Sequence, residues 1–99
     1  MRVIARRTLR QFWESPRGKD ARAALQDWHA RVVDADWAQP ADVKRQYGDA
    51  SILKGGRVVF NIAGNRYRLV AWINYPYRLV YVRFVGTHAE YDDIDAETI

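Results

Sequence analysis

Apolar residues in the first half of the chain repeat at helical spacing. A first set recurs at i, i+4, i+7 and i+8, which predicts one face of a helix: Ala5, Leu9, Phe12 and Trp13. The segment SPRG (15–18) should end this helix, because proline disfavours the helical conformation in the residue before it. A second helix is predicted after Asp20, a candidate N-cap, from the apolar residues Ala21, Ala24, Leu25, Trp28 and Val32. Pro40 suits the first position of a third, short helix that ends near Gly48.

From Ser51 onward the period changes to two, which is typical of strands. Four strand-like segments follow: SIL, RVVFNI, YRLVAWI and LVYVRFV. Their connections are short, so we expect an antiparallel meander, with MRVIA (1–5) as an edge strand. Helices come first and strands later, without βαβ alternation. This order predicts a single α+β domain over residues 1–99, with the N-terminal helices packed on one face of a mainly antiparallel sheet.

Alternation within the strands sorts their side chains onto two faces. One face is apolar and should pack on the helices: Val58, Phe60, Ile62, Tyr67, Leu69, Ala71, Ile73, Val80, Val82 and Phe84. The other face should gather polar and cationic residues at one end of the meander: Arg57, Asn61, Arg66, Arg68 and Arg83. Arg66 and Arg68 would repel each other on one face unless an anion lies between them, and this segment contains no acid. The second face is therefore predicted to bind anions, with Lys54 at its margin and the aromatic residues Trp72 and Tyr81 along it.

Charge is distributed unevenly along the chain. The net charge is +4, but residues 89–99 hold five acids and no base. Residues 1–88 therefore carry 16 Lys and Arg against 7 Asp and Glu, a balance of +9. A basic body with an acidic tail favours a polyanionic partner, of which nucleic acid is the first candidate; a solvated basic surface is the alternative.

The segment GTHAEYDDID (86–95) follows the last strand. Gly86 should break the strand, and the Thr87 hydroxyl can fix the local backbone. His88 and Tyr91 would then lie one helical turn apart beside the guanidinium groups. RNA cleavage without a metal requires such groups, because the 2′-hydroxyl loses a proton, the phosphorane needs neutralising and the 5′-oxygen gains a proton. Structural roles are the alternative: a hydrogen-bonded His88, a packed Tyr91, and an ion pair of Arg83 with Asp92 or Asp95.

The sequence contains no pattern typical of disulfide bonds, metal sites or membrane spans. Cysteine is absent, and the two histidines have no metal-ligand spacing. Consecutive acids on a tail seldom converge on one ion, so we expect neither a metal nor another cofactor. No apolar run is long enough to span a membrane, and we expect a cytoplasmic protein.

The segments SILKGGRVVFNIAGNRYRLVAWINY and YVRFVGTHAEYDDID resemble HigB-type toxins of bacterial type II toxin–antitoxin modules, within the RelE-like superfamily. DWAQPADVKRQYGDASIL fits as well, so the resemblance covers nearly the whole chain. The family pattern carries over onto Asn61, Gly64, Asn65, Arg68, Arg83, Thr87, His88 and Tyr91. It implies a small α+β protein that cleaves mRNA, commonly on translating ribosomes, and that a helix-turn-helix (HigA-like) antitoxin silences.

Together the pattern and the resemblance predict an endoribonuclease. The expected RNA-binding residues are Lys54, Arg57, Asn61, Asn65 and Arg66. Arg68 and Arg83 are expected to stabilise the transition state, while His88 and Tyr91 transfer protons. Two other functions stay open: a module that blocks RNA or the ribosome without cutting, and a DNA-binding domain. The second is less favoured, because the basic face is sheet and no helix carries a recognition pattern.

Overall fold

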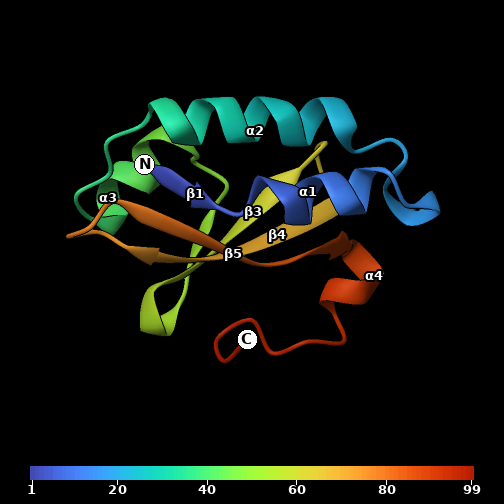
Figure 1. The fold of residues 1–99 in the computed structure, drawn as a ribbon. Helices are drawn as coiled ribbons and strands as arrows, with labels where there is room; N and C mark the ends of the chain where they lie inside the picture. The colour runs from blue at the N-terminus through green and yellow to red at the C-terminus, as the bar shows by residue number, and fades with distance from the viewer.

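The computed structural model describes residues 1–99 and places helices on one face of a five-stranded sheet (Figure 1). The helical elements are α1 (Arg6–Trp13), η1 (Pro16–Gly18), α2 (Arg22–Asp34), α3 (Pro40–Gln46), η2 (Lys54–Gly56) and α4 (His88–Tyr91). The strands are β1 (Arg2–Ile4), β2 (Ser51–Ile52), β3 (Arg57–Ile62), β4 (Tyr67–Asn74) and β5 (Leu79–Thr87). None of the helices has the length and apolar character needed to cross a membrane.

The sheet has the strand order β1-β5-β4-β3-β2. Strands β2 to β5 form the predicted antiparallel meander, and β1 pairs with β5 in parallel at the edge. The predicted α+β class is thus confirmed, as are the first and third helices. The N-cap of α2 is Ala21, so the prediction that Asp20 caps this helix is wrong.

The main core lies between the sheet and the helices, and Phe60 of β3 is at its centre. The Phe60 ring meets the rings of Trp28 and Tyr47 edge to face, at centroid distances of 5.3 and 5.2 Å. Trp37 stacks on Phe60 at 6.1 Å. Aromatic rings in these arrangements attract each other beyond the gain from burial alone. Because Trp28 comes from α2 and Tyr47 follows α3, this cluster fixes both helices on one face of the sheet.

The opposite face of the sheet, called the outer face below, is partly covered by residues 92–99. Figure 1 shows this segment, in red, running along the side of the sheet away from α1 and α2. Ala96 is buried there against Val59 and Val70. Partly buried apolar side chains complete this outer cluster: Leu53, Phe84, Tyr91, Ile94 and Ile99. The middle of the outer face is therefore apolar and packed, and the prediction of an open anion-binding face is wrong there.

A β-bulge in β5 decides which of its side chains reach the outer face. Ala71 pairs with Val82 and Val70 pairs with Phe84, so Arg83 is an extra residue without a partner on β4. One extra residue reverses the alternation beyond it. Phe84 consequently packs in the outer cluster, and the prediction that it faces the helices is wrong.

Candidate functional site

Several of the predicted site residues meet where the β3–β4 hairpin lies next to the start of α4. In register, Arg68 lies between Asn61 of β3 and Gly86 of β5. Gly86 is paired inside β5, so the prediction that it ends the strand is wrong. A Cβ at this position would lie 2.5 Å from the Phe84 ring and 3.0 Å from a Glu90 carboxylate oxygen. Glycine is required here because these two side chains occupy the space.

The Arg68 guanidinium is oriented by the hairpin turn. Its Nη2 donates to Asn65 Oδ1 at 3.1 Å, and its Nη1 donates to the Asn65 and Tyr67 carbonyl oxygens at 3.2 and 3.3 Å. Asn65 therefore occupies the edge formed by the two terminal nitrogens. On the other edge, Nε–H and the second N–H of Nη2 make no hydrogen bond. Two N–H groups along one edge of a guanidinium match two oxygens of a phosphate.

Helix α4 is a single turn held by a capping box. Thr87 Oγ1 accepts from the Glu90 backbone N–H at 3.1 Å, and Glu90 Oε1 accepts from the Thr87 N–H at 2.8 Å. The second Glu90 oxygen pairs with Arg17 of η1. The hydrogen bond from the Thr87 backbone, followed by the contact with Arg17, holds the pKa of Glu90 below its usual value. The predicted role of the Thr87 hydroxyl is confirmed.

His88 begins α4 and is exposed: 51% of its side chain is accessible to solvent. Its backbone N–H donates to the Arg66 carbonyl oxygen at 3.2 Å, which ties α4 to the hairpin. Its Nδ1 lies 3.3 Å from a carboxylate oxygen of Asp92, and its Nε2 makes no hydrogen bond. A carboxylate at Nδ1 orients an imidazole and leaves Nε2 available for proton transfer. Sequence reasoning missed this partner, although a spacing of four residues on a helix could have indicated it.

Tyr91 lies one helical turn after His88, as predicted. Its ring is half-buried and packs against the outer cluster of Val59, Val70 and Ala96. Its hydroxyl makes no hydrogen bond within the protein. The ring therefore anchors α4 to the sheet, while the hydroxyl keeps its donor and acceptor unused.

Arg57 and Lys54 do not join this group. Arg57 pairs with Trp72 at the opposite end of β3, four residues from Asn61, or about 13 Å along the strand. Its guanidinium donates to the main-chain oxygen of Ile99 at 3.0 and 2.7 Å and to that of Gly55 at 2.9 Å. Lys54 lies exposed beside it in η2. The prediction that Arg57 lies at the same end as Arg68 is wrong.

Arg66 lies in the hairpin turn and points to the helical side of the sheet. Its Nη2 donates to the Asp20 carboxylate at 2.9 Å, and its guanidinium lies 5.8 Å from the ring of Tyr67, a core residue. The prediction that it shares a face with Arg68 is wrong. Asp20 is the distant acid that balances its charge. Arg83 is exposed at the bulge and makes no ion pair. Asp92, one of its two predicted partners, contacts His88.

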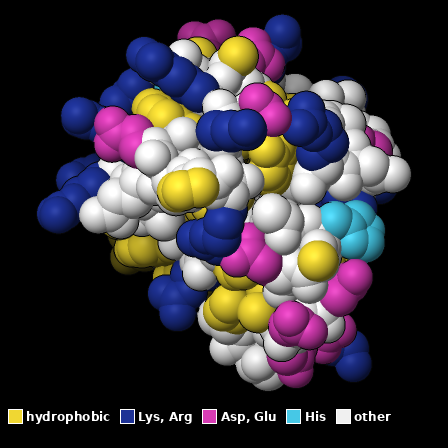
Figure 2. All heavy atoms as spheres, turned by 90° about the vertical axis from the view of Figure 1, so that its right-hand side faces the viewer, with side chains coloured by type: hydrophobic (Ala, Val, Ile, Leu, Met, Phe, Trp, Pro, Cys, Tyr) yellow, Lys and Arg dark blue, Asp and Glu magenta, His cyan; other side chains and the backbone are white.

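The end of the molecule that carries α4 shows the charge distribution directly. In Figure 2, most Lys and Arg side chains lie in the upper and left parts, with some acids among them, while a cluster of Asp and Glu side chains lies at the lower right. Figure 1 places the acid-rich segment 92–99 at that lower side. No three His, Asp or Glu side chains meet at one point as metal ligands would.

A family model described as HigB_toxin, RelE-like toxic component of a toxin-antitoxin system, matches residues 21–94. The chain belongs to this HigB toxin family. The match includes the hairpin, β5 and α4, and it leaves out β1, α1 and η1. No curated protein sequence matches the chain. Membership confirms the resemblance and gives this toxin an antitoxin as its partner.

We expect Glu90→Gln to lower the melting temperature of the toxin in a pH-dependent way. Because the pKa of Glu90 is lower in the folded state, its charge stabilises the fold above pH 4.5, and this contribution is lost as the pH falls through the folded-state pKa. Thermal melts of wild type and variant should therefore differ at neutral pH and converge in acid. Glu97→Gln, at an exposed carboxylate without a hydrogen bond, is the matched control and should melt like wild type. A Glu90→Gln difference that persists in acid would contradict this role.

Proposed function

We propose that this toxin is an endoribonuclease that cleaves mRNA by attack of a 2′-hydroxyl on the adjacent phosphate. The products are a 2′,3′-cyclic phosphate and a 5′-hydroxyl. One observation carries the proposal: His88, oriented by Asp92, lies beside the hairpin that presents the unoccupied edge of Arg68. An oriented imidazole next to a free guanidinium edge supplies a proton acceptor and phosphate neutralisation together.

Arg68 neutralises the phosphorane in this mechanism. Its Nε and Nη2 groups bind two non-bridging oxygens of the phosphate, since Asn65 already fills the other edge of the guanidinium. Asn65 is thus a positioning residue for Arg68. A charge aimed in advance at the developing anion needs no reorganisation during the reaction.

His88 and Tyr91 transfer the protons. His88 Nε2 takes the proton from the 2′-hydroxyl while Asp92 keeps the ring in place through Nδ1. The Tyr91 hydroxyl, which has no partner in the protein, gives a proton to the 5′-oxygen that leaves. The exposure of His88 favours this role over a structural one, because its side chain contributes no buried packing.

The RNA crosses the hairpin end of the outer face, because residues 92–99 cover its middle. Asn61 lies beside Arg68 on this path, and Arg83 is exposed further along β5. Lys54 and Arg57 lie outside it, at the far end of β3. We further propose that the toxin acts on translating ribosomes in the cytoplasm and that its antitoxin is a helix-turn-helix protein of the HigA type, as its family resemblance implies.

We expect His88→Gln to lower the single-turnover rate of RNA cleavage by about 10²–10⁴-fold, the usual effect of losing one acid–base group. His29→Gln is the matched control, since it removes the other histidine, which lies on α2. The melting temperature should stay unchanged in both variants. A well-folded His88→Gln protein that cleaves at the wild-type rate would exclude the mechanism. RNA binding by the wild type without cleavage, when translating ribosomes are present, would favour the blocking module.

We expect Arg68→Lys to keep most of the RNA affinity and to lose most of the cleavage rate. An ammonium group keeps the charge, but it cannot form two parallel hydrogen bonds with a phosphate. Binding and single-turnover cleavage measured on the same RNA separate these two effects. Arg31→Lys, at an exposed arginine of α2, serves as the control. Full activity in Arg68→Lys would reduce Arg68 to a surface charge.

A further inference from the structure

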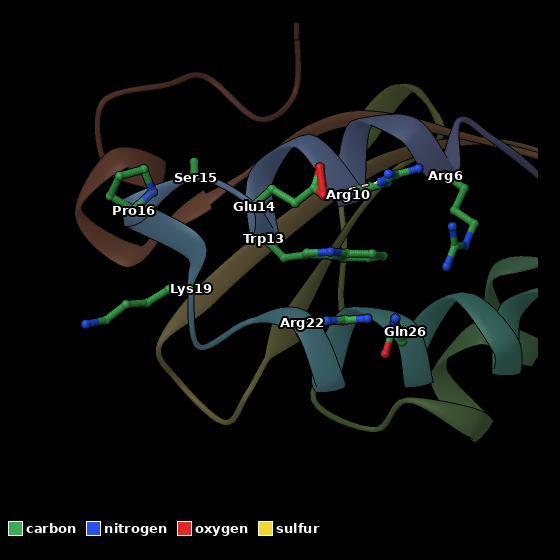
Figure 3. Close-up of a pocket in the computed structure, with 9 residues that line it drawn as sticks. All are labelled: Arg6, Arg10, Trp13, Glu14, Ser15, Pro16, Lys19, Arg22 and Gln26. Atoms are coloured by element: carbon green, nitrogen blue, oxygen red, sulfur yellow. Dashed lines mark hydrogen bonds and ion pairs between the residues drawn. The ribbon is translucent and has the colours of Figure 1, made fainter.

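A groove of about 640 Å³ lies between α1 and α2, on the helical side of the sheet. Nine residues line it: Arg6, Arg10, Trp13, Glu14, Ser15, Pro16, Lys19, Arg22 and Gln26. Figure 3 shows the Trp13 ring between the α1 wall, which carries Arg6 and Arg10, and the α2 wall, which carries Arg22 and Gln26. Its polar walls contrast with the packed core beneath it, which includes Trp13.

The groove holds an excess of positive charge. Four of its residues are cations, and its one acid, Glu14, lies 3.4 Å from Arg10 Nε. Arg6, Lys19 and Arg22 make no ion pair. The surface continues along α1 into a second hollow that adds Arg7. Cations that line one hollow without partners raise the local concentration of anions there.

The geometry of Arg6 shows that its charge acts inside the groove. Its guanidinium carbon lies 5.4 Å from the centre of the Trp13 ring, so the side chain folds over the groove and is held there by a cation–π contact. His29 lies on α2. Its pKa is lowered mainly by partial burial and, to a smaller extent, by the positive charge of Arg6. Arg6 is thus a fixed positive charge between the two helices.

The residues that line the groove suit an extended polyanion with regularly spaced charges better than they suit a folded protein. Protein interfaces have an apolar centre, whereas Trp13 is the only hydrophobic residue among the nine here. Trp13 as a residue is only 8% exposed, so it offers neither a protein anchor nor a platform for base stacking. The other prominent groups in the groove are the arginine and lysine side chains on its two facing walls. Such an arrangement suits the phosphate backbone of a nucleic acid.

We propose that the groove between α1 and α2 is a second RNA-binding site, which holds the phosphate backbone of an RNA strand away from the bond that is cut. The inference rests on the proposed function for the identity of the polyanion. It extends that function because these residues lie outside the cleavage site. Arg6, Arg10 and Lys19 also precede the segment that matches the family model.

The test is the salt dependence of RNA binding by the double variant Arg6→Gln/Arg22→Gln. The matched control is Arg31→Gln/Arg45→Gln, which removes two exposed arginines of α2 and α3 outside the groove. The probe is a fully 2′-O-methylated RNA, which the proposed chemistry cannot cleave. Each lost phosphate contact lowers the slope of log K against log salt by about 0.7 for a single strand. The groove variant should therefore lose about 1.4 in slope and about 25-fold in affinity at about 0.1 M salt, while the control keeps the wild-type slope.

Equal slopes for wild type and the groove variant would overturn the proposal, as would an equal loss of slope in both double variants. So would a groove variant that keeps its RNA affinity but loses binding to the antitoxin, because the groove would then serve an acidic protein. Failure of the proposed cleavage is distinguishable: wild-type toxin would bind methylated RNA with the full slope and leave unmodified mRNA intact even on translating ribosomes. Melting temperatures of both double variants check that the four substitutions, all at exposed positions, leave the fold unchanged.

Discussion

The single extra residue in β5 is the constraint on which the site depends. Up to Val82 the strand alternates in step with β4, and after Arg83 the alternation is reversed. The reversal turns Phe84 toward the outer face, where it packs with Val70 and the segment 92–99. The same shift sets Gly86 opposite Arg68 and so places the start of α4 at the hairpin. A bulge of this kind re-aims side chains at the end of a strand without disturbing the core beneath it.

Much of the fold could be predicted from the sequence because the spacing of apolar residues indicates which side chains are buried. The helical repeat around Leu9 and the alternation around Phe60 mark residues that contact the core, so the helices, the strands and the α+β class followed. The bulge at Arg83 left no such trace, since LVYVRFV alternates convincingly on either side of it. Alternation also fails at turn residues. Arg66 is two residues from Arg68, as if both lay on one face of a strand, but it lies in the hairpin turn and pairs with Asp20.

The candidate site was predicted in part for a related reason. The spacing of His88 and Tyr91 is local, and the structure places both on α4. The position of Arg57 depends on the length of β3 and on where the chain goes after α4, which no local pattern specifies. Asp92 was considered only as a partner of Arg83, although its spacing from His88 fits one helical turn. Contacts between distant segments, such as Arg17 with Glu90, could not be read from the sequence at all.

The end groups of mRNA cut by the toxin in a translation reaction with ribosomes test the central claim most directly. Attack by the 2′-hydroxyl, with protons handled by His88 and Tyr91, predicts a 2′,3′-cyclic phosphate on one fragment and a 5′-hydroxyl on the other. Fragments with 5′-phosphate and 3′-hydroxyl ends would contradict the account.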